Sequence, residues 1–135
     1  MPGLQSRVTR LLEEGNLEGG FPMSMVCTDL GLLVASAGDG SPSEALAVLV
    51  SLFDDVVARA RRDMEMFAVD ELTLRDATQG RFVIRPLLLP SSSRMFLVVH
   101  VPGAQRWRRT TNRLCSRLQV ELEWLGGTQD GADVD

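Results

Sequence analysis

Met25-Val-Cys-Thr-Asp-Leu-Gly-Leu-Leu-Val-Ala-Ser36 is the stretch of sequence that decides the fold. Two apolar runs flank Asp29-Leu30-Gly31, and aspartate and glycine both favour tight turns. Residues 23–28 and 32–37 are therefore predicted to form the two strands of a β-hairpin.

A helix is expected on each side of this hairpin. Before it, apolar residues recur at helical spacing until Gly15-Asn16, which is predicted to end the first helix. After it, Ser41, Pro42 and Glu44 form a capping box with proline at the first helical position, which predicts a helix over residues 41–64. The apolar positions of the first helix are Leu4, Val8, Leu11 and Leu12.

Three more strands and a last helix are predicted to follow. The strands span residues 69–76, 81–89 and 95–101, and the third is apolar on both faces, which places it centrally in the sheet. Pro102-Gly103 ends it, and a helix is expected over residues 104–122. Its inward stripe is Trp107, Thr111, Leu114, Leu118 and Leu122.

The predicted order is α-β-β-α-β-β-β-α, an α+β fold with a single five-stranded antiparallel sheet and helices on both faces. A chain of 135 residues fits one domain. We expect this domain to span residues 1–125 and the acidic residues 126–135 to form a disordered tail.

Composition narrows the function classes. Hydrophobic residues make up 44% of the chain and charged residues 24%, which excludes wholesale disorder. The net charge of −4 argues against general binding to nucleic acid or membrane surfaces. No apolar run approaches the roughly 18 residues of a membrane helix, and no secretory signal is visible. A cytoplasmic protein without membrane insertion is expected.

The chain offers little for catalysis. All basic residues are arginine, so a Walker-A loop, a Schiff base and a lysine general base are excluded. His100 is the only histidine, and Cys27 and Cys115 lie far from any Cys-x-x-Cys spacing. We expect two buried thiols and a structural histidine, with a Cys27–His100 nucleophile pair as the alternative. No catalytic, cofactor-binding or metal-binding residue is assigned, and the chain is predicted not to be an enzyme.

The central helix is apolar over two stripes. The first stripe is Ala45, Val48, Leu52 and Val56, and the second is Leu46, Leu49, Val50, Phe53, Val57 and Ala60. An arc this wide needs cover on a second side. We expect the second stripe to form a homodimer contact, in which four large side chains contribute about 6–12 kcal/mol before association costs. Cover by another part of the same chain is the alternative.

The last predicted helix is basic. Arg106, Arg109, Arg113 and Arg117 share one face, and no acidic residue lies between Pro102 and Arg117. A solvated helix surface explains this stripe, and a docking patch for an acidic protein surface is the sharper alternative. Nucleic acid is disfavoured because Trp107 is the single aromatic residue nearby.

Four segments together resemble the roadblock/dynein-light-chain family, and within it the bacterial MglB-like regulators of small Ras-like GTPases. They are the hairpin quoted above, the long apolar helix, Arg81-Phe-Val-Ile-Arg-Pro-Leu87, and Phe96-Leu-Val-Val-His-Val101 leading into a helix. The resemblance covers residues 23–122, with Leu30 as an extra residue in the hairpin turn.

The resemblance implies a homodimer that pairs through the central helix and the third strand, with one sheet continuous across a two-fold axis. It places Leu46, Leu49, Val50, Phe53, Val57, Val69, Glu71 and Thr73 at the dimer interface. It also implies a non-catalytic regulator or scaffold that binds a small Ras-like GTPase without a cofactor. Stimulation of GTP hydrolysis, without an inserted arginine finger, and plain scaffolding both stay open.

Two other classes compete with this interpretation. Type III secretion chaperones are also small, acidic, dimeric αβ proteins, but they place three strands between their first two helices, whereas two are predicted here. A protein-binding scaffold without a GTPase partner belongs to the same alternative. An enzyme or small-ligand sensor is least favoured, because no titratable residues cluster in the sequence.

Overall fold

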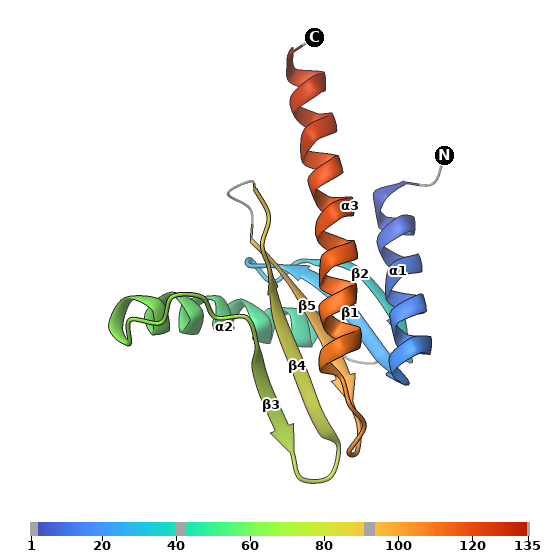
Figure 1. Cartoon of the computed structure of the whole chain (residues 1–135), viewed down its shortest axis with the longest axis vertical. Coiled ribbons are helices and arrows are strands. Elements are labelled where there is room, and N and C mark those ends of the chain that lie inside the picture. Colours follow the sequence, from blue (N-terminus) through green and yellow to red (C-terminus); the bar gives the residue numbers. More distant parts are fainter. Residues whose placement is uncertain (1–2, 40–42, 91–93, 135) are drawn as a thin grey trace.

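The computed structural model describes residues 3–39, 43–90 and 94–134, except for the side chains of residues 43, 44 and 124–134. These residues form one antiparallel sheet of five strands in the order β2-β1-β5-β4-β3 (Figure 1). The elements are α1 (Leu4–Gly19), β1 (Met23–Thr28), β2 (Leu33–Gly38), α2 (Ser43–Asp63), β3 (Leu72–Asp76), β4 (Gly80–Leu87), β5 (Met95–Val101) and α3 (Arg108–Val134).

The predicted fold class and element order are confirmed. β5 is the central strand, as its apolar sequence predicts, and it pairs with β1 on one side and β4 on the other. Two strands separate α1 from α2. This order differs from the one expected of a type III secretion chaperone.

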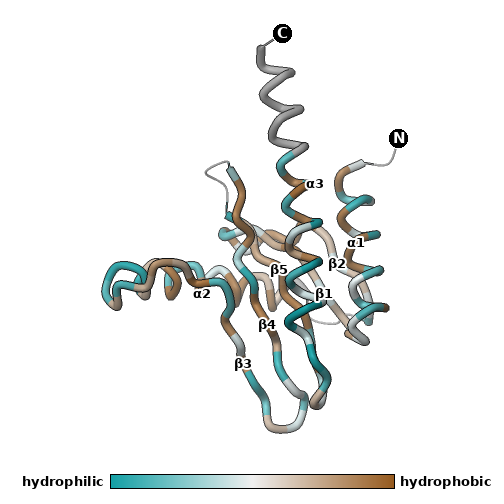
Figure 2. The backbone as a smooth tube through the Cα atoms, in the orientation of Figure 1, coloured by the Kyte–Doolittle hydropathy of each residue, from teal (hydrophilic) through white to brown (hydrophobic). Residues whose placement is uncertain are grey.

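The two faces of the sheet carry different helices. α1 and α3 lie side by side on one face, and α2 crosses the other, with its C-terminal end reaching beyond the sheet (Figure 1). Side chains of β5 alternate between the two cores: Leu97 and Val99 pack under α1 and α3, whereas Phe96 and Val98 pack under α2. Figure 2 shows apolar positions along the central strands and along α2.

α1 is longer than predicted. It continues through Gly15-Asn16 and ends at Gly19, and Gly20 with a φ of 70° forms its left-handed C-cap. Gly15 is buried against α3, where an added Cβ would lie 2.8 Å from Leu114 Cδ2. The glycine therefore serves close helix–helix packing and not a helix end.

The predicted start of α2, at the capping box of Ser41, Pro42 and Glu44, lies outside the described residues. Its end agrees with the prediction within one residue. Beyond Asp63, the amides of Met64 and Met66 donate to the Ala60 carbonyl. Glu65 between them has a φ of 57°, so a residue other than glycine occupies the left-handed position after the helix.

Three other boundaries differ from the prediction. β3 begins at Leu72 instead of residue 69, because the Asp70 carbonyl accepts from Arg85 Nε instead of joining a ladder. β4 ends at Leu87. α3 begins at Arg108 instead of residue 104, and the Gln105 side chain donates to the Gly19 and Gly20 carbonyls.

α3 also extends beyond residue 122, to Val134. The predicted domain boundary at residue 125 falls where side chains are outside the described part of the chain. The division into a domain of residues 1–125 and a disordered tail of residues 126–135 stays a prediction.

The first hairpin contains a bulge. Val26 pairs with Ala35 but Cys27 pairs with Leu33, which leaves Val34 as an extra residue on β2. In the turn, the Gly31 amide donates to the Thr28 carbonyl and the Leu30 amide donates to Thr28 Oγ1. The extra Leu30 is thus accommodated by a local hydroxyl acceptor.

Candidate protein-interaction surfaces

The outward side of α2 is an apolar face. Val48 and Leu52 are 61% and 63% exposed, and Leu49 and Val56 are also exposed. Together these four residues are called the outer α2 face. Exposed large apolar side chains in one row on a helix mark an interaction surface.

Three members of the second stripe of α2 pack against its own sheet. Leu46 and Val50 are buried, and Phe53 packs half-buried against the same core. The prediction that this stripe faces a partner is therefore wrong for Leu46 and Val50, whereas Leu49 is exposed. Both stripes have the same helical spacing, so the sequence pattern could not decide which one faces the sheet.

The remaining predicted interface residues are dispersed. Val57 and Val69 line a hollow of about 390 Å³ between α2 and the ends of β4 and β5. The Glu71 carboxylate accepts a hydrogen bond of 3.1 Å from Trp107 Nε1, which turns it toward α3. Thr73 is exposed on β3.

β3 forms an open edge of the sheet. Within the described residues it pairs with β4 alone, so its outer backbone groups are unpaired. Leu74 on this strand is 47% exposed. An edge strand with an exposed apolar side chain is a template for pairing with another chain.

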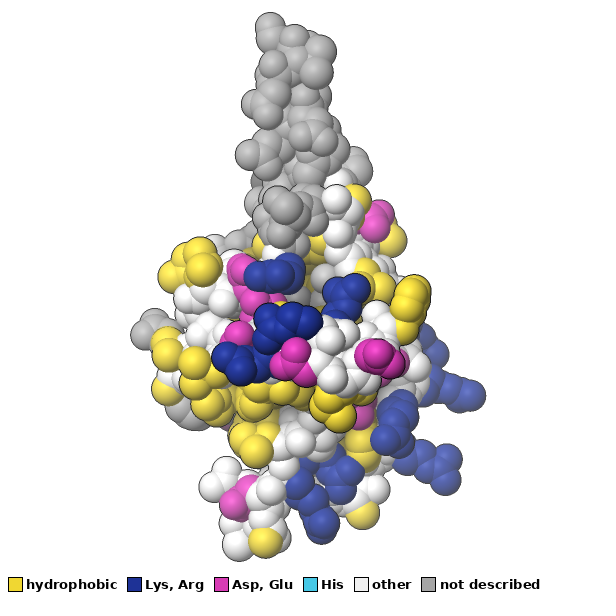
Figure 3. Space-filling model, turned by 90° about the vertical axis from the view of Figure 1, so that its left-hand side faces the viewer, with side chains coloured by type: hydrophobic (Ala, Val, Ile, Leu, Met, Phe, Trp, Pro, Cys, Tyr) yellow, Lys and Arg dark blue, Asp and Glu magenta, His cyan; other side chains and the backbone are white. Residues whose placement is uncertain are grey.

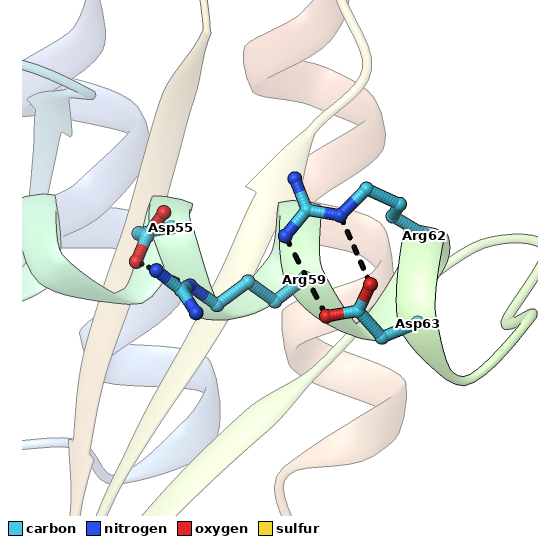
Figure 4. Close-up of polar contacts among 4 residues, drawn as sticks. All are labelled: Asp55, Arg59, Arg62 and Asp63. Atoms are coloured by element: carbon cyan, nitrogen blue, oxygen red, sulfur yellow. Dashed lines mark hydrogen bonds and ion pairs between the residues drawn. The ribbon is translucent and has the colours of Figure 1, made fainter.

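Charged side chains border the apolar face at the end of α2. Arg59 Nε lies 2.9 Å from Asp55 Oδ2, and Arg62 Nε lies 3.0 Å from Asp63 Oδ1 (Figure 4). These four side chains are more than half exposed, so each pair contributes at most about 1 kcal/mol to stability. An apolar centre with a polar rim is the usual composition of a protein interface.

An ion-pair network fixes α2 against the first hairpin. Arg94, just before β5, lies 2.9 Å from Asp54 Oδ2 on α2 and 3.4 Å from Asp29 Oδ2 in the hairpin turn. Desolvation raises the pKa of Asp54, and the Arg94 guanidinium opposes that shift. The network holds the outer α2 face in a fixed orientation.

Two of the four arginines in the predicted basic stripe form ion pairs within the chain. Arg113 pairs with Glu18, and Arg117 Nη1 lies 2.9 Å from Glu14 Oε2, so both arginines bind α1. Arg106 precedes α3. Arg113 and Arg117 therefore already have acidic partners within the chain, and a docking role for the stripe stays a prediction. The acidic partners lie on another helix, about 100 residues earlier in the chain, where a local sequence window does not reach.

The three residues considered for catalysis are separated. Cys27 is paired with Phe96, whereas His100 is paired with Met23, four residues along the strand. At about 3.3 Å per residue, they lie roughly 13 Å apart. Both thiols are buried, and desolvation raises the pKa of Cys27 to about 12 and that of Cys115 to about 11. Thiols with such pKa values are poor nucleophiles at neutral pH.

His100 has a structural setting. Its ring stacks on Phe82 at a centroid distance of 4.6 Å, and Nε2 lies 2.8 Å from the Gln79 carbonyl. Across the described residues, no three histidine, cysteine or acidic side chains gather closely enough to bind a metal ion. Every described helix is too short or too polar to span a bilayer.

No protein-family model and no curated protein sequence matches this chain. Solved structures do. The gliding protein MglB from Thermus thermophilus has a TM-score of 0.74 and 15% identity, and the match covers 90% of this chain and 92% of that one. An MglB with a tetrameric arrangement has a TM-score of 0.71 and 15% identity over 90% and 91%. The Roadblock/LC7 domain from Streptomyces avermitilis has a TM-score of 0.65 and 11% identity, and the match covers 87% of this chain and 96% of that one.

The fold is roadblock-like. The resemblance inferred from the hairpin, the long helix and the two later strands is thereby confirmed at the level of fold. In this roadblock-like chain the outer α2 face and the β3 edge are both free, and the described residues form no catalytic cluster.

Proposed function

We propose that the chain is a homodimeric, non-catalytic regulator or scaffold that binds a small Ras-like GTPase in the cytoplasm. The likeness to MglB over nine-tenths of both chains is the observation that carries the proposal. The resemblance of the sequence to MglB-like regulators supports the same partner class.

The dimer contact is assigned to the outer α2 face and the β3 edge. Burying the four apolar side chains of that face contributes about 3–6 kcal/mol before the loss of translational and rotational freedom, because each of them is already partly buried in the single chain. Pairing of two β3 edges adds backbone hydrogen bonds and joins the two sheets. The MglB of tetrameric arrangement supports association between copies of this fold.

The role toward the GTPase is regulation or scaffolding and not chemistry supplied by this chain. The described residues offer no activated nucleophile and no metal cluster. A partner therefore responds to the surface it contacts, either by a change in its hydrolysis rate or by being held in place.

The dimer is tested by measuring the mass in solution at micromolar concentration. Wild type is expected to have twice the chain mass, and Leu52→Glu is expected to have the mass of one chain because a charge enters the apolar contact. Leu17→Glu on α1 is the matched control, since Leu17 is 86% exposed and lies away from α2. A monomeric wild type, or equal dissociation of both variants, contradicts the proposed interface.

The GTPase partner is tested by capture on the immobilised protein from lysate of the source organism, with GDP in one arm and a non-hydrolysable GTP analogue in the other. Recovery of a small GTPase mainly with the analogue supports a regulator, and hydrolysis assays follow. Equal recovery in both arms indicates a scaffold. Absence of any GTPase from both arms overturns the GTPase assignment and leaves a protein-binding scaffold.

A further inference from the structure

Arginines without an acidic partner concentrate in one region of the molecule. Among the described residues, the arginines that form ion pairs are Arg7, Arg59, Arg62, Arg94, Arg113 and Arg117. A second group forms no ion pair with any described residue and lies on the β3–β4 hairpin and at the start of α3. This arginine cluster consists of Arg75, Arg81, Arg106, Arg108 and Arg109; Arg85 on β4 also forms no ion pair but is held by neutral acceptors and is not counted in it.

Two members of the cluster lie directly opposite each other. Arg75 on β3 pairs with Arg81 on β4, so both side chains project from the same face of the sheet. Like charges at directly opposed positions destabilise a sheet, by an amount comparable to the roughly 0.2–1 kcal/mol that opposite charges contribute. An anion outside the chain would remove this repulsion.

Trp107 organises the cluster. The guanidinium carbon of Arg81 lies 4.4 Å from the centre of its ring, and that of Arg108 lies 4.7 Å from the same centre. The indole N–H is fixed on Glu71 Oε1. Stacking on a fixed ring holds the planar donor groups in place before any ligand arrives, which lowers the entropy lost on binding.

One donor of the cluster is unused. Arg81 Nε is buried and has no hydrogen-bond partner among the described residues. This Nε is shielded from solvent in the unbound chain, so an acidic partner would meet the exposed side chains of Arg106, Arg108 and Arg109 instead. Arg106, Arg108 and Arg109 line an adjacent open hollow of about 560 Å³.

The support beneath the cluster is rigid. Arg85 Nη1 donates to Asn112 Oδ1 at 2.8 Å and to Thr111 Oγ1 at 3.2 Å, while its Nε donates to the Asp70 carbonyl. These bonds join the hairpin to the start of α3. In Figure 3, some dark-blue side chains lie at the bottom and along the lower right edge of the molecule, at the level of the β3–β4 hairpin in Figure 1, and others lie at mid-height.

We propose that the arginine cluster around Trp107 is a docking surface for an acidic patch on a partner protein. It lies on the α1–α3 face of the sheet, opposite the outer α2 face. Arg75 lies on β3, whose edge belongs to the proposed dimer contact, whereas the other four arginines lie outside that strand. Interface hot spots are enriched in tryptophan and arginine, and carboxylates match the guanidinium fork.

A protein patch fits this surface better than an extended polyanion. The chain as a whole carries a net charge of −4, which repels nucleic acids and anionic membranes over most of its surface. Trp107 has both neighbouring guanidinium groups against its ring, so it offers no free platform for a stacked base. A local acidic patch meets the cluster without approaching the rest of the molecule.

The test uses a synthetic peptide of alternating glutamate and serine as the acidic probe, and its glutamine counterpart as the neutral one. Affinity is measured by titration at low and moderate salt. Wild type is expected to bind the acidic peptide in a salt-dependent manner, and Arg106→Ser/Arg109→Ser is expected to bind it about tenfold more weakly. The matched control is Arg10→Ser/Arg61→Ser, which removes two other exposed arginines that form no ion pair with described residues.

Both double variants are first compared with wild type by thermal unfolding, since none of the four arginines makes a hydrogen bond to a described residue and the fold is expected to persist. Equal weakening by the control variant overturns the proposal, as does failure of wild type to bind the acidic peptide. Tighter binding of single-stranded DNA or phosphatidylserine vesicles through the same two arginines also overturns it. The assay needs neither a GTPase nor a dimer, so its failure is distinct from failure of the proposed function.

Discussion

Gly38, the last residue of β2, shows how much one residue decides. Its φ is 97°, and an added Cβ would overlap the Pro22 carbonyl oxygen, which also accepts from the Asp39 amide. Because the overlapped atom belongs to the backbone, it cannot move aside as a flexible side chain could. The position therefore requires glycine for two independent reasons.

Gly38→Ala is expected to lower the free energy of unfolding by about 2 kcal/mol or more, because the strained φ and the overlap add. Urea denaturation measures the change. Gly3→Ala is the control, since nothing lies within 4 Å of an added Cβ there. A loss as small as that of the control would show that the hairpin end moves freely.

Asp76 stabilises the β3–β4 turn through its ionised form. Its Oδ2 accepts from the Thr78 hydroxyl at 2.5 Å and from the amides of Thr78 and Gln79 at 2.9 and 2.8 Å. The hydrogen bond from the Thr78 side chain, followed by those from the Gln79 and Thr78 amides, holds the pKa of Asp76 below its usual range. The contribution to stability is therefore present above the unfolded-state pKa, about 3.9, and is lost as pH falls through the lowered folded-state pKa.

Asp76→Ala is expected to be less stable than wild type at neutral pH, and the difference should shrink as the pH falls below about 3.9. Urea unfolding of both proteins at a series of pH values measures this difference. A gap that stays constant down to pH values at which the wild-type carboxylate is protonated would contradict the assigned role.

At the scale of elements, α1 and α3 are joined by ion pairs as well as by apolar packing. Arg7 Nε lies 3.0 Å from Glu121 Oε2, and Arg113 and Arg117 pair with Glu18 and Glu14. The pairs run along the seam between the two helices. They fix the alignment of the helices more than they add to stability, because each is partly exposed to solvent.

A double-mutant cycle of Glu14→Gln and Arg117→Gln is expected to give a coupling energy of about 0.3–1 kcal/mol at low salt, since both side chains are about half exposed. Thermal or urea unfolding of the four proteins supplies the values. The same cycle between Glu14 and Arg109 serves as the control and is expected to show no coupling. Coupling in both cycles would indicate a general charge effect.

The sequence predicts the existence and type of every element, because hydrophobic periodicity and turn residues are local signals. The prediction fails where a contact between residues distant in the sequence determines the local structure. Gly15 looks like a helix end but packs on Leu114, and the basic residues of α3 look free but meet glutamates of α1. Neither contact leaves a trace within a local window of sequence.

At the scale of the whole molecule, the same limit applies to the two stripes of α2. Their spacing shows that the helix has two apolar sides, but the crossing angle on the sheet selects Leu46 and Val50 as the inner one. The apolar side chains on the opposite side of the helix are then left exposed and form the outer α2 face. The family resemblance implies that the central helix and the third strand are used for pairing, and the structure shows which of their apolar side chains are exposed.

Dimerisation through the outer α2 face predicts that thermal stability depends on protein concentration, because association stabilises the folded state by mass action. The melting temperature of wild type is expected to rise with concentration over the micromolar range. Leu52→Glu is expected to melt at one temperature throughout. A wild-type melting temperature that is the same at all protein concentrations would contradict dimerisation through this face.

The bulge at Val34 determines where growth of the sheet stops. Once two β3 edges have joined, the outermost strand at each end of the shared sheet is β2, and its irregular hydrogen bonding is a poor template for another strand. The β3 edge is thus suited to pairing with another strand, whereas the β2 edge is not. In the proposed dimer, the shared sheet is therefore expected to stop growing at its two β2 edges.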